Sequence, residues 1–135
     1  MKNNIIIFVI GFLSIFMIYG LVFGLFFADY FQSMIEKYPS VLRSIPLMPG
    51  VAVAHAIQTV LVIYLFTRMK VNTLKEGVIS GVILFVLFES VFTIFIFATV
   101  SFIPITHILA DILLSSIPGA IGGGIIGYSI GRFND

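Results

Sequence analysis

The chain of 135 residues contains no cysteine and few charged residues. The lack of cysteine excludes disulfides, thiolate nucleophiles and metal centres bound by cysteine. Charged residues make up 10% of the chain and the net charge is +1, so no basic patch is present to neutralise nucleic-acid phosphates. Instead, 60% of the residues are hydrophobic and the mean hydropathy is +1.20. Soluble domains have about half apolar and about a quarter charged residues, so this composition predicts an integral membrane protein.

Four apolar stretches are each long enough to cross a bilayer, whose core of ~30 Å needs about 20 helical residues. They are predicted as helices at about 5–28, 50–67, 73–100 and 104–131. Their apolar residues do not alternate with polar ones, which excludes a transmembrane β-barrel. The first stretch is too long for a signal-peptide core and no small-residue cleavage site follows it, so we expect a retained helix. The sequence therefore predicts an all-α polytopic membrane protein, with one four-transmembrane-helix bundle as a single domain over residues 1–135.

Two of these helices have recognisable starts. Thr73 and Glu76 are spaced as a capping box, in which the two side chains accept hydrogen bonds from the free backbone N–H groups of the first turn. Pro104 suits the first turn of the fourth helix, because a proline there removes no helical hydrogen bond. We therefore expect a tight turn at 101–103 between the third and fourth helices.

The segment 29–49 is the only sizeable stretch outside the apolar runs. Its apolar side chains recur mostly at helical spacing with polar residues between them, which is typical of a short amphipathic helix lying in the membrane interface. Such an interfacial helix between the first and second spans serves either as an anchor or as a lid over a site that opens outward. Its apolar positions are Tyr30, Phe31, Met34, Ile35, Tyr38 and Leu42.

Lysine and arginine are distributed unevenly over this arrangement. Positively charged loops are retained preferentially in the cytoplasm. We therefore predict that both termini are cytoplasmic. Five basic residues lie on the side of the termini and two on the other: Lys2, Arg68, Lys70, Lys75 and Arg132 against Lys37 and Arg43.

Glu89 lies in the middle of the apolar stretch 77–102. A carboxylate at the centre of a membrane helix costs roughly 2.5 to 3.5 kcal/mol on insertion scales unless it is paired or protonated, so its presence predicts a functional site. The other apolar stretches supply candidate partners. Counting about 1.5 Å per residue from the outer helix ends makes Glu89 the deepest of them and His107 the shallowest. The predicted ligand or proton site comprises His55, Gln58, Glu89, Asp111 and His107.

The sequence leaves several uses of this polar group open. One is interhelical hydrogen bonding, worth about 0.6 to 2 kcal/mol per contact. A second is a proton or ion pathway, or a site for a small polar molecule. A third is a metal or haem site: two histidines and two carboxylates suit zinc, iron or manganese, and His55 with His107 would suit axial haem ligation, although the spacing matches no metal signature. A fourth is hydrolytic or transfer chemistry within the membrane, which is less expected because no nucleophile–base pair is recognisable.

Every fourth residue of the fourth helix is polar or small. Small residues at this spacing let two helices approach until their backbones touch. The same spacing occurs at Gly20 and Gly24 and at Gly77 and Gly81. We predict close packing of the fourth helix, either within the chain or against a second copy or a partner membrane protein. The stripe begins with His107, Asp111 and Ser115 and continues as the packing residues Gly119, Gly123, Gly127 and Gly131.

Pro118 lies inside the same helix. A proline frees the carbonyl group four residues earlier, here that of Leu114, and bends the helix. Ser115 and Ser116 are placed to take up freed backbone groups. We predict a bend below the polar group, which is either a hinge for alternating access or a matter of shape alone.

Two segments resemble small bacterial four-helix membrane proteins that are classed as domains of unknown function. They are Tyr19-Gly-Leu-Val-Phe-Gly24, and Ala110-Asp111 with the glycine-rich run that follows to Gly127. The resemblance covers most of the chain. It implies a location in the bacterial inner membrane and no established activity, so it assigns a role to no residue.

The sequence favours a small inner-membrane protein whose polar group binds or transports a small polar ligand or ion, coupled to a proton. The alternative is a non-catalytic helper that packs against partner helices through its glycine face. The two hypotheses differ in the residues they depend on: Glu89 in the first and Gly123 in the second.

Overall fold

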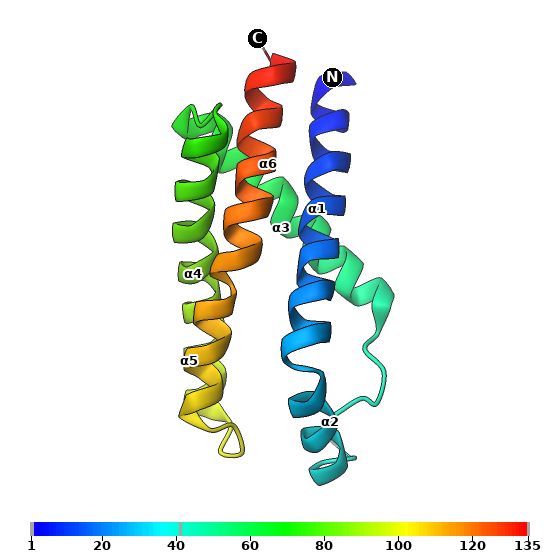
Figure 1. Cartoon of the computed structure of the whole chain (residues 1–135). Helices are drawn as coiled ribbons and strands as arrows, with labels where there is room; N and C mark the ends of the chain where they lie inside the picture. Colours follow the sequence, from blue (N-terminus) through cyan, green and yellow to red (C-terminus); the bar gives the residue numbers. More distant parts are fainter. Residues whose placement is uncertain (1, 41, 135) are drawn as a thin grey trace.

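The computed structural model describes residues 2–40 and 42–134, and over this range it is all-helical (Figure 1). Residues 1, 41 and 135 of the predicted domain lie outside the described range. The helices in order are α1 (Lys2–Phe26), α2 (Ala28–Lys37), α3 (Met48–Met69), α4 (Leu74–Thr99), α5 (Ile105–Leu114) and α6 (Ser116–Asn134).

Four helical stretches are long and apolar enough to cross a membrane. Three of them are α1, α3 and α4, and the fourth combines α5 and α6 over Ile105–Phe133. Each overlaps one predicted span, with ends that differ by a few residues. The short helix α2 follows α1 almost directly, within the segment that the sequence marked as amphipathic.

The start of α4 is fixed by side chains, as the sequence predicts. The Thr73 hydroxyl accepts a hydrogen bond from the Glu76 backbone N–H at 3.2 Å, and Glu76 Oε2 accepts one from the Asn72 backbone N–H at 3.3 Å. The Thr73 cap is thereby confirmed, whereas Glu76 reaches the N–H of Asn72, one residue before the cap, and not that of Thr73 as in a complete capping box. At the preceding turn Lys70 ends α3 in the left-handed conformation, with φ of 58°.

The fourth span is interrupted between α5 and α6 at Ser115. Pro118 lies one turn further on and has no N–H to donate to Leu114, which explains a break at this place. The two serines donate to neighbouring carbonyl groups and not to that of Leu114: Ser115 Oγ to Ile112 at 2.6 Å, and Ser116 Oγ to Leu113 at 2.6 Å.

The helix α6 occupies the centre of the molecule, with α4 on one side and α1 on the other (Figure 1). More of its span is buried than that of any other long helix. The helix α3 crosses obliquely behind α6 and α1. Both described chain ends lie at the same end of the bundle, where the Asn3 side chain donates a hydrogen bond to the Phe133 carbonyl oxygen. The opposite end holds α2 and the turn between α4 and α5.

Glycines bring α4 and α6 into backbone contact. A methyl group added at Gly119 would lie 2.7 Å from the Gly81 carbonyl oxygen, and one at Gly123 would lie 2.5 Å from that of Gly77. At Gly127 the nearest atom would be the Thr73 carbonyl oxygen at 2.7 Å. The last member of the stripe, Gly131, would meet the backbone of Asn72 in the same way. In this structure the glycine stripe of α6 therefore packs against the same chain.

Gly20 and Gly24 depart from the packing pattern that their spacing predicts. A methyl group added at either would meet no atom of the described residues within 4 Å. They bring no described helix into contact, although their spacing equals that of Gly77 and Gly81. Equal spacing therefore specifies a small surface and not a partner for it.

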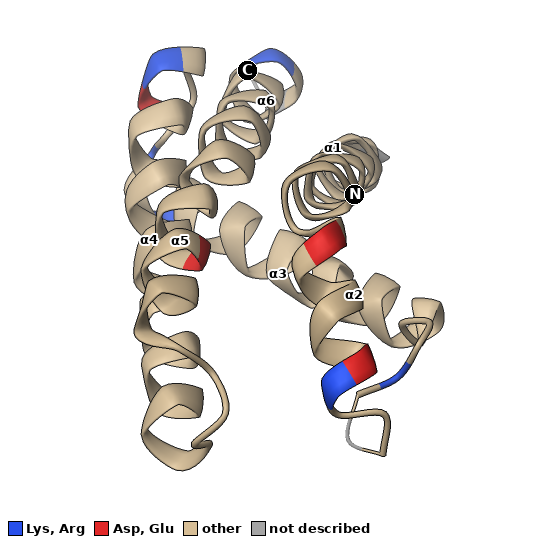
Figure 2. Ribbon diagram, turned by 60° about the horizontal axis from the view of Figure 1, so that its bottom comes forward, with Lys and Arg blue, Asp and Glu red and all other residues tan. Residues whose placement is uncertain are grey.

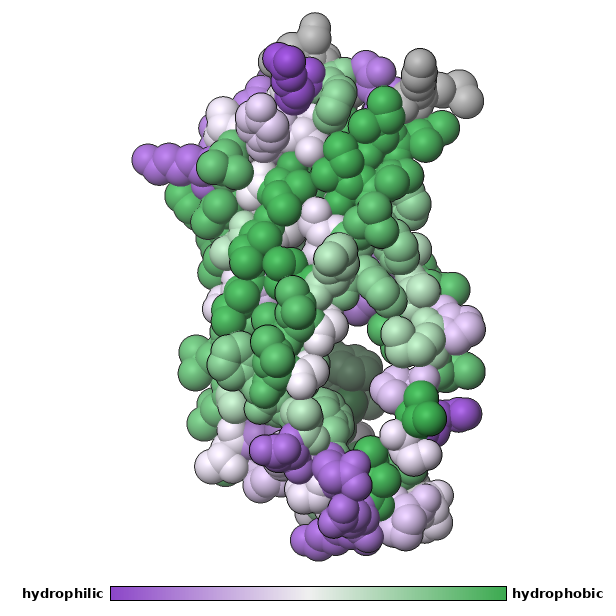
Figure 3. Space-filling view, turned by 45° about the vertical axis from the view of Figure 1, so that its right-hand side comes forward, coloured by the Kyte–Doolittle hydropathy of each residue, from purple (hydrophilic) through white to green (hydrophobic). Residues whose placement is uncertain are grey.

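The core lies where α1, α3, α4 and α6 meet. Ile15, Val62, Phe85 and Ile126 are among its most buried members, each no more than 1% exposed. The outer surface is also largely apolar. Figure 3 shows a broad hydrophobic band between hydrophilic ends. Figure 2 shows lysines and arginines near those ends, and acidic residues along α2 as well as beside α4 and α5.

Candidate functional site

A cavity of about 700 Å³ lies in the half of the molecule that contains α2. It is bounded by α1, α2, the connection from α2 to α3, the first turns of α3, and α4 with α5. A hollow is visible in this half of the molecule in Figure 3. Four aromatic side chains form what we call the aromatic wall of the cavity: Phe16, Tyr19, Phe23 and Phe31.

Glu89 of α4 and Asp111 of α5 face each other on the opposite wall and are called the carboxyl pair below. They are close enough for a direct side-chain hydrogen bond. Two ionised carboxylates can only accept, so this bond requires a proton on one of them. A carboxyl pair in this arrangement can share one proton.

The hydroxyl groups near Glu89 donate hydrogen bonds to backbone carbonyl groups and not to the Glu89 carboxyl group. Thr93 Oγ1 donates to the Glu89 backbone carbonyl at 2.6 Å, and Ser90 Oγ donates to that of Val86 at 2.7 Å. Asp111 Oδ1 is buried and has no hydrogen-bond partner among the described residues. A buried acceptor without a partner is costly, and a proton between this carboxyl group and that of Glu89 would remove the cost.

A second polar group links α3 to α1. His55 Nδ1 and Gln58 Oε1 are 3.1 Å apart, and because an amide oxygen only accepts, the histidine carries the hydrogen here. Gln58 Nε2 then donates to the Tyr19 hydroxyl at 3.5 Å. The Tyr19 ring packs on the His55 ring with centroids 4.6 Å apart. Tyr19 is also close enough to Glu89 and Asp111 to interact with them electrostatically. It therefore lies between the carboxyl pair and the His55–Gln58 group.

His107 lies in a separate aromatic setting at the α2 end. Its ring stacks on Tyr30 with centroids 4.1 Å apart, and Phe27 meets it edge-on at 5.3 Å. The Tyr30 hydroxyl is buried without a hydrogen-bond partner among the described residues. Burial, and then the nearby Asp111 carboxyl, raise the pKa of Tyr30. The stack connects α2 to α5 beside the carboxyl pair.

The structure thus divides the five predicted site residues. His55, Glu89 and Asp111 line the cavity, whereas Gln58 stands behind His55 and His107 lies against α2. The partner of Glu89 is another carboxyl group and not a histidine. Tyr19 was not among the predicted site residues, because nothing in the apolar stretch around it distinguishes it in the sequence.

The described residues contain no group of three histidine, aspartate or glutamate side chains that could hold a metal ion. His55 and His107 belong to different clusters, one against Tyr19 and the other against Tyr30. They are therefore not arranged as two axial ligands of one haem.

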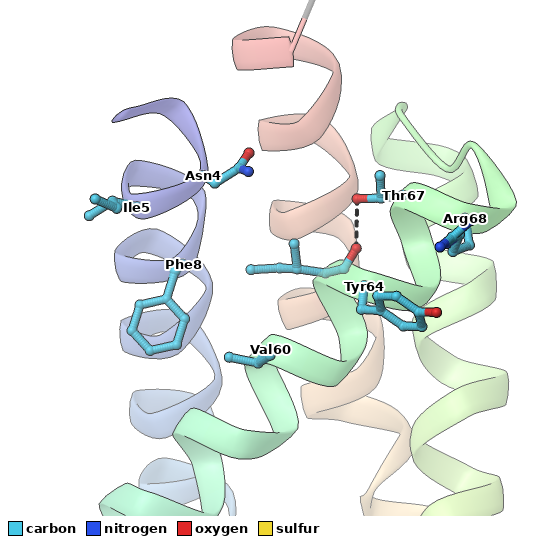
Figure 4. Close-up of a pocket in the computed structure, with 8 residues that line it drawn as sticks. Asn4, Ile5, Phe8, Val60, Tyr64, Thr67 and Arg68 are labelled. Carbon is cyan, nitrogen blue, oxygen red and sulfur yellow. Dashed lines mark hydrogen bonds between the residues drawn. The ribbon is translucent and has the colours of Figure 1, made fainter. Parts of the chain in front are cut away.

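A second, smaller hollow of about 450 Å³ lies between the start of α1 and the second half of α3 (Figure 4). Its walls are mainly apolar, with Phe8 and Val60 below and Asn4, Thr67 and Arg68 near the chain ends. The Thr67 hydroxyl donates to the Ile63 carbonyl at 2.7 Å. None of the described residues that line this hollow is acidic or a histidine, so we place the candidate site in the larger cavity.

No protein-family model matches the chain, and comparisons with curated proteins and with solved structures give no significant match.

Proposed function

We propose that this chain is a multi-pass protein of the bacterial inner membrane, and that its cavity binds a ligand in exchange for a proton of the carboxyl pair. The observation that carries the proposal is the meeting of Glu89 and Asp111 on a cavity wall, between helices long and apolar enough to span a membrane. Intramembrane carboxyl groups are costly and typically belong to ligand or proton pathways.

The proposed orientation has both termini in the cytoplasm. Arg68, Lys70, Lys75 and Arg132 lie toward the end of the bundle that holds the chain ends, and basic loops are retained in the cytoplasm. The cavity then lies in the outer half of the membrane. In this arrangement α2 lies in the outer interface beside the cavity mouth, where its Tyr30 contacts His107.

The exchange follows from the electrostatics of the pair. Without a ligand, both carboxyl groups are protonated and the apolar site carries no net charge. When a ligand with positive charge enters, one proton leaves and the remaining proton bridges Glu89 and Asp111. The net charge inside the membrane is then the same before and after exchange. Binding alone and transport both use this step.

The infrared carboxyl stretch of the purified protein tests this function. At neutral pH we expect a band of protonated carboxyl groups that weakens in Glu89→Gln and in Asp111→Asn, while both variants keep the helical content of the wild type. A wild-type spectrum with ionised carboxylates only would contradict the proposal.

The alternative function, a helper that packs on partner helices through its glycine face, is less well supported. In the structure this face of α6 is covered by α4. A partner would have to displace α4. A leucine at position 123 would separate a helper from its partner. Its side chain would also collide with the Gly77 backbone of the same chain.

A further inference from the structure

The lining of the cavity is unusual for a site that binds a small polar molecule. The aromatic wall runs along α1, where Tyr19 and Phe23 stack with centroids 5.5 Å apart. Besides the carboxyl pair, the described helical spans contribute two ionisable side chains to the lining, Tyr19 and His55. The His55 ring is already hydrogen-bonded to Gln58. The helix α2 and the connection after it add the polar side chains Gln32, Arg43 and Ser44, whereas the part of the lining that α1 supplies is apolar and aromatic apart from the Tyr19 hydroxyl. A bare metal ion would lack ligands, since the described residues offer no group of three.

We infer that the ligand is a lipophilic organic cation, held between the aromatic wall and the carboxyl pair. This inference rests on the proposed function and specifies its ligand class. Aromatic faces attract cations and also bury an apolar body. A carboxylate opposite the rings supplies a charge-assisted contact. Glu89 and Asp111 both line the cavity, so the carboxylate that remains after proton release is the group that such a cation would meet.

The size of the cavity agrees with this ligand class. Cavities of roughly 300–1,000 Å³ hold drug-sized molecules, and this one has about 700 Å³. Gly20 and Gly24 keep it open, since both line it and neither has a described atom within 4 Å of where a side chain would begin. Because these two glycines have no side chains, they leave space for a ligand beside the aromatic wall.

Because binding releases a proton, the affinity for the ligand should depend on pH. Each bound cation displaces one proton, so affinity should rise about tenfold per pH unit while the ligand-free pair stays protonated. Other titratable or charged groups face the pair or the cavity from each neighbouring element, and they must be distinguished by substitution. They are Tyr19 of α1, Tyr30 of α2, Arg43 of the connection, His55 of α3 and His107 of α5.

The test uses tetraphenylphosphonium and tetraphenylborate, which share shape and differ in the sign of their charge. Calorimetry on the full chain in detergent should show saturable binding of the phosphonium, with release of one proton for each ion bound, and no binding of the borate. We expect Glu89→Gln to weaken phosphonium binding by at least about tenfold. Proton release that is lost in His55→Gln but kept in Glu89→Gln would assign the proton to the histidine and overturn the inference.

Gly24→Leu is the variant that distinguishes loss of ligand binding from loss of the protonated carboxyl pair. A leucine there extends into the cavity without meeting the backbone of another described helix, so the protein should fold and should keep its protonated-carboxyl band while phosphonium binding is lost. Leu25→Ala, on the exposed side of the same helix, is the matched control and should bind as the wild type does.

Equal binding of the two probes would overturn the inference. Phosphonium binding that is unchanged in both Glu89→Gln and Gly24→Leu would overturn it as well. If the phosphonium fails to bind while the infrared band of the pair is present, the ligand class is wrong and the proton-exchanging site stands. If that band is absent, the proposed function itself fails.

Discussion

At the scale of single residues, two glycine pairs with the same spacing have opposite surroundings. Gly77 and Gly81 of α4 lie against the backbone of α6, whereas Gly20 and Gly24 of α1 face the cavity. The first pair permits contact between helices, and the second leaves a volume unfilled. The spacing alone predicts neither, because it describes one helix and not what lies opposite.

Gly81→Ala should therefore destabilise the bundle, and Gly24→Ala should not. The added methyl group at Gly81 would overlap the Gly119 carbonyl oxygen, and overpacking of this kind typically costs about 1–3 kcal/mol. At Gly24 the methyl group meets no described atom, and alanine favours a helix more than glycine does. Unfolding in a denaturing detergent series measures both. Equal stability of the two variants would contradict the α4–α6 contact.

The site was only partly predictable from individual residues. A carboxylate in the apolar stretch of α4 singles out Glu89, but His55, Gln58, His107 and Asp111 were equal candidates as its partner. A membrane helix is apolar all round, so hydropathy does not fix how the helix is rotated about its axis relative to its neighbours. In the structure, the rotation of α4 and α5 places Asp111 beside Glu89.

At the scale of elements, the four long helices followed from composition because each apolar run is continuous and about one membrane thickness long. The capping box likewise located the start of α4. The break between α5 and α6 was expected as a bend at Pro118, and it lies at Ser115, one turn earlier. The cavity was not predictable, since it depends on how far α1 stands from α5.

The contact between α2 and α5 depends on the stack of Tyr30 on His107. Tyr30→Ala should loosen α2, because an aromatic pair contributes about 0.5–1.5 kcal/mol beyond its buried area. The chain has no cysteine, so spin labels can be placed at Ser33→Cys and Leu109→Cys alone. We expect a broader distance distribution in Tyr30→Ala than in the control Lys37→Ala. Identical distributions would show that the stack does not hold α2.

At the scale of the whole molecule, the termini and the turn between α3 and α4 share one end, and the cavity opens in the other half. This layout agrees with the unequal distribution of basic residues that the sequence shows. In the proposed exchange, protons of the carboxyl pair leave through the cavity that Glu89 and Asp111 line.

Single cysteines in the otherwise cysteine-free chain test the orientation. Ser40→Cys, at an exposed position in the connection after α2, should react with a membrane-impermeant maleimide in intact bacterial cells. Lys70→Cys, in the turn between α3 and α4, should react only after the membrane is opened. The reverse pattern would place the cavity on the cytoplasmic side.

The central claim, a carboxyl pair that holds and exchanges a proton, is tested most directly by following its infrared band during a pH titration of the protein in lipid vesicles. The account predicts a protonated-carboxyl band at neutral pH that disappears reversibly as the pH rises, and that is altered in both Glu89→Gln and Asp111→Asn. A band that is absent at neutral pH, or one that neither substitution changes, would contradict it.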